Sequence, residues 1–125
     1  MPKLTESTNL GDLLKYEAPN LYSRDRVTVA SGQTLGLGAV VGRVTATGKI
    51  KRFDPSATDG SQSPAGVLLD PIDASLADRH DGLIVARHAI VADTALGWPV
   101  GITGAEKTAA LATLTSLGIL ARASV

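Results

Sequence analysis

Two histidines and the aspartates beside one of them are the residues of this chain with the clearest chemical potential. His80 stands between Asp78 and Asp81, and His88 follows eight positions later. Imidazole nitrogens and carboxylate oxygens both bind transition metals, so these residues have the donor types of a metal site. A boundary between a polar loop and an apolar run separates the histidines, which gives them no shared geometry. We therefore expect no metal site, with His80 a solvated loop residue and His88 a strand or interface residue.

Other signatures of catalysis and nucleotide binding do not fit the sequence. The glycine-rich segment at residues 36–42 has its last glycine one position too late for a dinucleotide-binding loop. Neither a Walker A sequence nor the Gly-x-Ser-x-Gly of hydrolase nucleophiles is present. The chain has no cysteine, which excludes thiolate nucleophiles, disulfides and cysteine-bound zinc. We expect no cofactor and no enzymatic activity.

Composition predicts one small domain with an aliphatic core. The 125 residues are 44% hydrophobic but only 3% aromatic, so Val, Leu, Ile and Ala must build that core. No run of Ala, Val, Ile, Leu, Met, Phe or Trp exceeds four residues, which predicts a soluble chain without a membrane helix or an export signal. A net charge of zero and the scarcity of aromatics argue against nucleic-acid binding. With 13 glycines and 6 prolines, we expect a weak monomer that gains stability by oligomerising.

The zero net charge hides two segments of opposite sign. Residues 24–52 contain six basic side chains and one acidic side chain, whereas residues 54–81 contain six acidic and one basic. One explanation is that both segments are solvated loops and edges of the same subunit. The other is head-to-tail packing of subunits in a ring, where complementary charge would fix the register of the contact.

The elements that would position these residues are mostly short strands. An apolar run at residues 40–46, a turn at Thr47-Gly48 and alternating charged and apolar residues at 49–53 predict a β-hairpin. We expect a polar loop at residues 74–82 and further strands at residues 27–30, 65–69, 83–91 and 119–125.

One helix is expected near the C-terminus. Thr103 and Glu106 have the spacing of a capping box, residues 105–117 contain good helix formers, and Gly118 is predicted to end the helix. Trp98, the only tryptophan, precedes a proline that keeps its backbone extended. It is expected either to brace the start of the helix inside one subunit or to lie at a subunit boundary, where aromatics are enriched.

The N-terminal part of the chain differs from the rest. Residues 1–9 are polar and lack a periodic apolar pattern, so they should not fold alone, and apolar side chains that need a partner follow them. We predict an N-terminal arm at residues 1–22 and a β-rich domain at residues 23–125. In the alternative, residues 10–14 form a short helix or strand that packs on its own trimer.

Four segments of the chain form a series typical of one protein family. They are VTVASGQ at residues 27–33, VTATGK at 44–49, a DGS turn at 59–61 before an apolar strand, and Trp98-Pro99 before a helix that contains lysine. Together they resemble the head decoration proteins of lambda-like tailed phages, and the likeness extends from residue 16 to residue 122.

The resemblance implies a mainly β fold of the β-clip or β-tulip type, with one α-helix near the C-terminus and an extended N-terminal arm. It implies a homotrimer that is made in the host cytoplasm and binds the major capsid protein on the outer surface of the phage head, at threefold positions. There it would stabilise the expanded head against internal DNA pressure, with the arm adding strands to capsid protein. The expected capsid-binding arm residues are Leu4, Leu10, Leu13, Leu14, Tyr16, Leu21 and Tyr22.

Charge complementarity and the enrichment of aromatics at interfaces suggest contacts between subunits. The expected trimer-interface residues are Arg43, Arg52, Asp70, Asp73, His88 and Trp98. Two other classes of function remain open from the sequence. A trimeric β-rich nucleotide hydrolase would need a metal-binding acidic site, and a carbohydrate-binding or host-binding module usually displays several exposed aromatics.

Overall fold

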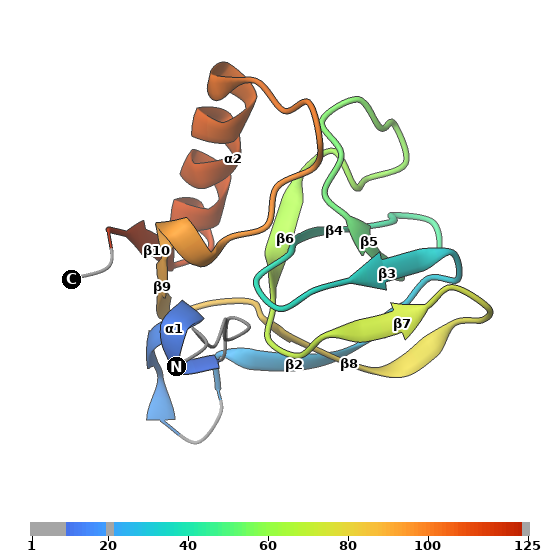
Figure 1. The fold of residues 1–125 in the computed structure, drawn as a ribbon, viewed down its shortest axis with the longest axis horizontal. Coiled ribbons are helices and arrows are strands. Elements are labelled where there is room, and N and C mark those ends of the chain that lie inside the picture. Colours follow the sequence, from blue (N-terminus) through green and yellow to red (C-terminus); the bar gives the residue numbers. More distant parts are fainter. Residues whose placement is uncertain (1–9, 20–21, 124–125) are drawn as a thin grey trace, which may run out of the picture.

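The computed structural model describes residues 10–19 and 22–123, and the fold over these residues is mainly β, as predicted (Figure 1). Its helical segments are α1 (Leu10–Leu13), the 3₁₀ turn η2 (Asp93–Ala95) and α2 (Gly104–Ser116). Its strands are β1 (Leu14–Glu17), β2 (Arg24–Val29), β3 (Gln33–Leu35), β4 (Val40–Arg43), β5 (Ile50–Arg52), β6 (Pro64–Leu68), β7 (Ile72–Ala74), β8 (Arg79–Val85), β9 (Ala89–Ala92) and β10 (Ile119–Arg122).

Five strands close into a small barrel in the order β2-β5-β4-β6-β8. Two of these strands, β4 and β5, form the predicted hairpin: they pair antiparallel, with Val41 opposite Arg52. Gly48 takes a positive φ of 74° in the connecting turn, which is a conformation that glycine adopts without strain. Val29, Val41 and Ile50 are fully buried in the cluster that fills this part of the molecule.

The short sheet of β3 and β7 lies against the barrel at β5. The backbone N–H of Arg52 donates to the side-chain oxygen of Gln33 at 3.0 Å, and the Arg52 guanidinium donates to the carbonyl of Thr34 at 3.4 Å. These bonds satisfy polar groups of β5 and β3 where no strand ladder joins them.

A third sheet has the order β1-β9-β10 and lies beside α2, at the left of Figure 1. Strand β9 is central: β1 pairs with it antiparallel and β10 pairs with it parallel. The side chains of Val91 and Ile119 point into a second core cluster, together with Leu114 of α2. This cluster joins the sheet, the helix and the barrel into one packed body.

Helix α2 begins and ends as the sequence predicts. The Thr103 hydroxyl accepts from the backbone N–H of Glu106 at 3.1 Å, and the Glu106 carboxylate accepts from the backbone N–H of Thr103 at 3.0 Å. Gly118 follows the last turn with a φ of 85°. The predicted capping box and the predicted stop are both confirmed.

Two predicted boundaries are wrong. Residues 79–82, expected in a polar loop, belong to strand β8, where Gly82 pairs with Val27. A Cβ at Gly82 would lie 3.0 Å from the Val27 carbonyl oxygen, so a glycine lets the two backbones approach closely here. The single strand expected at 83–91 is two strands, separated by a turn in which His88 has a φ of 48°. That turn carries the chain from the barrel into the third sheet.

Candidate functional site

The structure places the predicted arm residues in two different environments. Leu13 is fully buried in the core cluster with Leu114 and Ile119, and Leu10 and Leu14 pack against the same cluster. Residues 10–13 thus form a short helix that packs on its own chain, and the packing of this segment within a trimer stays a prediction. Leu4 and Leu21 lie outside the described residues.

Among the described arm residues, Tyr16 and Tyr22 are the ones that are exposed. Tyr16 is 53% exposed and Tyr22 is 55% exposed. The ring of Tyr22 lies 5.3 Å from the ring of His88, and the Arg87 guanidinium lies 5.4 Å from its centroid. Aromatic and arginine side chains with this degree of exposure are enriched at protein interfaces.

Polar contacts anchor Ala18, which follows β1, and Ser23, which precedes β2. The buried hydroxyl of Ser23 donates to the His88 carbonyl at 2.8 Å and accepts from the Ala18 N–H at 3.0 Å. Glu17 receives two bonds of 2.7 Å from the Arg24 guanidinium, and these bonds hold the pKa of the Glu17 carboxyl below its usual value. The exposed Tyr22 is therefore displayed from an anchored turn.

Two of the predicted trimer-interface residues are linked through Thr34. Arg52 donates to the Thr34 carbonyl, and the Thr34 hydroxyl donates to the Asp73 carboxylate at 3.4 Å. Hydrogen bonds from the hydroxyl and the backbone N–H of Ser75, together with the bond from Thr34, lower the pKa of the Asp73 carboxyl. The structure brings Arg52 and Asp73 together within one subunit, and their role between subunits stays a prediction.

The other four predicted interface residues are dispersed. Arg43 is exposed at the end of β4, Asp70 is exposed in the turn after β6, and His88 lies beside Tyr22. Trp98 is half-buried: its ring meets the Phe53 ring edge-on, with centroids 6.3 Å apart. The Lys107 ammonium lies 5.6 Å from the Trp98 ring centroid, so Trp98 braces the first turns of α2 inside its own chain.

The two segments of opposite charge contact one another within the subunit. Lys49 pairs with Asp78 at 2.6 Å, and Lys51 pairs with Asp59 at 3.1 Å. The Asp59 carboxylate also accepts from the hydroxyl and the N–H of Ser61, and these three contacts hold its pKa far below the usual range. The explanation by solvated loops and edges of one subunit therefore accounts for much of the charge pattern.

The side chains of His80, Asp78 and Asp81 already make contacts with other residues of the chain. His80 lies 3.0 Å from the Thr28 hydroxyl, Asp78 binds Lys49, and Asp81 binds Arg79 at 2.7 Å. Within residues 10–19 and 22–123, no three His, Asp or Glu side chains are grouped closely enough to hold a metal ion.

A surface hollow of about 620 Å³, lined in part by Arg43 and Arg87, is open to solvent.

The outer surface of the third sheet displays residues that the sequence reasoning missed. Ile90 and Leu120 are half-buried and Arg122 is exposed, and none of them packs against either core cluster. Adjacent residues of a strand face opposite sides, so one of Ile119 and Leu120 had to face away from the core. This signal could not be used without knowing that β10 pairs with β9.

Comparison with known proteins gives one positive result. The family model for bacteriophage lambda head decoration protein D matches residues 3–119, which is nearly the whole chain. No curated protein matches the chain. The described helices include none that is long and apolar enough to cross a membrane. Since the match extends over the barrel, the helix and strands β1 and β9 of the third sheet, the chain belongs to the bacteriophage lambda head decoration protein D family.

Proposed function

We propose that this phage head decoration protein acts as a homotrimeric clamp at threefold positions of the expanded head. As a member of its family it is a structural protein that associates with the capsid on the outer surface of the virion head. The finer proposal is that each trimer bridges neighbouring capsid subunits and stabilises the head against the pressure of packaged DNA. The family match over residues 3–119 is the observation that supports it.

Multivalency supplies the energy in this arrangement. Three weak contacts held in one rigid trimer can raise the avidity by about 10² to 10⁴ over a single contact, provided that all three match the geometry of the head. A protein that binds only the expanded head also stabilises that state by mass action. No catalytic site is needed for either effect.

The N-terminal arm contributes strand addition in this proposal. Within the part of the chain that the structure describes, strand β1 is at one edge of the third sheet and pairs on one side only, with β9. An exposed strand edge is a template for a strand of another chain. This supports a contact between residues near β1 and the backbone of the major capsid protein.

Light scattering and co-sedimentation with expanded, undecorated heads test the proposal. We expect the purified protein to have the mass of a trimer and to pellet with expanded heads but not with unexpanded ones. A stable monomer that stays in the supernatant would contradict the clamp.

Deletion of residues 1–9 tests the role of the arm. We expect the truncated protein to keep its trimeric mass and to bind heads more weakly, because the part of the arm that precedes α1 is lost from all three subunits. A deletion that extends through Lys15 is unsuitable, because it would remove the buried Leu13 and half of β1. Loss of the trimer in the shorter deletion would show that the arm holds subunits together instead.

A further inference from the structure

The outer surface of the third sheet carries an apolar row that crosses all three strands. Tyr16 of β1 and Leu120 of β10 both pair in register with Ile90 of β9. We call Tyr16, Ile90 and Leu120 the outer row. Although each is wholly or partly apolar, none packs against either core cluster.

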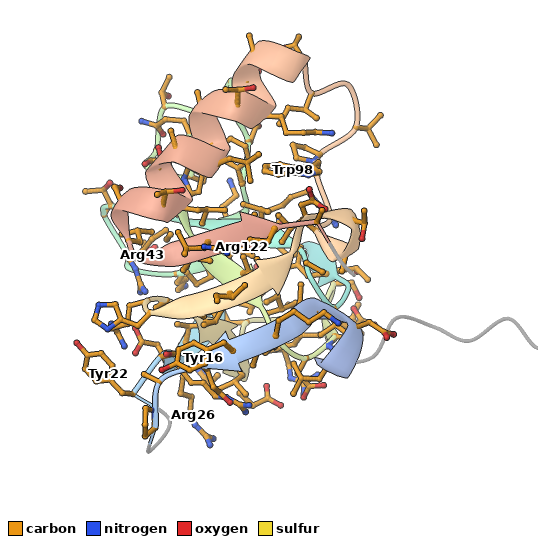
Figure 2. The ribbon with its side chains drawn as sticks, turned by 90° about the vertical axis from the view of Figure 1, so that its left-hand side faces the viewer. Tyr16, Tyr22, Arg26, Arg43, Trp98 and Arg122 are labelled. Carbon is orange, nitrogen blue, oxygen red and sulfur yellow. The ribbon has the colours of Figure 1, made fainter. Side chains whose placement is uncertain are left out.

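On the opposite face of the same sheet, the corresponding side chains pack in the core. Leu14, Val91 and Ala121 form the corresponding inner row, and all three pack in the core cluster that includes Leu114 of α2. The core shared by the helix and the barrel therefore covers this face of the sheet. Figure 2 looks onto the other face, where Tyr16 and Arg122 are seen against the strands.

The arginine beside the outer row, Arg122, has no carboxylate partner within the described part of the chain. Arg122 follows Leu120 by two positions on β10, is exposed, and has no hydrogen bond or ion pair within the described part of the chain. An apolar centre with a charged rim is the usual anatomy of a protein interface.

The distribution of carboxylates argues against a second copy as the partner of this face. Five described carboxylates are held in ion pairs within the chain, and three more accept backbone N–H groups of nearby residues. The first group is Glu17, Asp25, Asp59, Asp78 and Asp81, and the second is Asp54, Asp73 and Glu106. A neighbouring copy would have few free acids to offer, so the charge favours a partner with an acidic surface of its own.

We propose that the outer row and Arg122 form a capsid-docking face that receives an acidic surface segment of the major capsid protein. An apolar side chain of that segment lies on the outer row, and a carboxylate pairs with Arg122. This inference rests on the proposed decoration function and adds a second contact, separate from strand addition at β1. It also gives a reason why Tyr16 is exposed beside the half-buried Ile90 and Leu120.

Two substitutions of exposed side chains test the docking face. Tyr16→Ser removes the apolar ring and Arg122→Glu reverses the charge, and each is expected to weaken binding to expanded heads by at least about tenfold. Both residues are exposed, so the thermal unfolding midpoint should stay at the wild-type value. Matched controls are Leu76→Ser, at a side chain that is 98% exposed, and Ala112→Glu, which adds an acidic charge at an exposed position of α2.

The outcomes separate this inference from the function on which it rests. Wild-type protein that fails to bind expanded heads would refute the decoration function itself. Wild-type binding that Tyr16→Ser and Arg122→Glu leave unchanged would refute the docking face alone. If Arg122→Glu or Tyr16→Ser lowers the mass in light scattering, the face contacts a second copy and the proposal is overturned. Head binding that falls for these variants but not for the two controls would support it.

Discussion

At the scale of single residues, aspartates hold the long connections of this protein in place. Asp59 is bonded to Ser61 and Lys51, and Asp78 is bonded to the backbone N–H of Ser31 and to Lys49. Because these contacts favour the charged carboxylate, they lower the pKa of both groups. The loops are ordered by ionised acids on the surface, where no core packing is available.

These lowered pKa values predict the response of stability to acid. A carboxyl whose pKa is lower in the folded than in the unfolded protein contributes stability above its unfolded pKa, about 3.9 for Asp. That contribution is lost as the pH falls through the folded pKa. We expect the urea midpoint to be nearly constant from pH 7 to about 5 and to decrease below about 4.

Asp59→Asn provides the control for this acid response. The amide keeps an oxygen that can accept from Ser61, but it carries no charge to titrate and cannot pair with Lys51. The variant should have a lower urea midpoint at pH 7 and a smaller decrease between pH 5 and pH 3. A decrease equal to that of the wild type would show that other groups govern acid unfolding.

At the scale of elements, α2 depends on local signals at both of its ends. Thr103→Ala removes the hydroxyl that accepts from the Glu106 N–H and should lower the free energy of unfolding by about 1 kcal/mol. Thr115→Ala is the matched control, because Thr115 is exposed in the last turns and alanine is the better helix former. Chemical denaturation of both variants checks the prediction, and equal effects would refute the role of the cap.

Elements that are set by nearby residues could be predicted from the sequence, whereas an element set by distant residues could not. The capping box, Gly118 and the hairpin around Gly48 are set by residues within a few positions, and each was predicted correctly. The break between β8 and β9 has no such signal. His88 takes its positive φ in a turn fixed by Ser23, whose hydroxyl binds the His88 carbonyl from 65 positions away.

At the scale of the whole molecule, the N-terminal segment belongs to the packed body from residue 10 onward. Leu13→Ala would leave a cavity beside Leu114 and Ile119 and should destabilise the protein by about 2 to 5 kcal/mol. The control is Leu76→Ala, at an exposed loop position, with an expected effect within about 0.5 kcal/mol. Urea denaturation measures both. An unchanged midpoint for Leu13→Ala would support an arm that is energetically separate from the domain, with the predicted boundary at residue 22.

The family and its general role could be inferred from segments spread along the sequence, whereas the docking face could not. Tyr16, Ile90 and Leu120 become neighbours only through the register of two strand pairs. In the sequence they are separated by tens of positions. The role proposed for Arg122 likewise depends on its position on β10 next to that row.

The position of β9 between β1 and β10 has a consequence for biosynthesis. One neighbour of β9 is made near the start of translation, whereas the other emerges from the ribosome only after α2. A nascent chain cannot complete the sheet until then, because such non-local pairing must wait for both partners. An incomplete translation product lacks Leu120 and Arg122 and so presents no complete docking face. Head assembly would thereby select finished subunits without any separate proofreading factor.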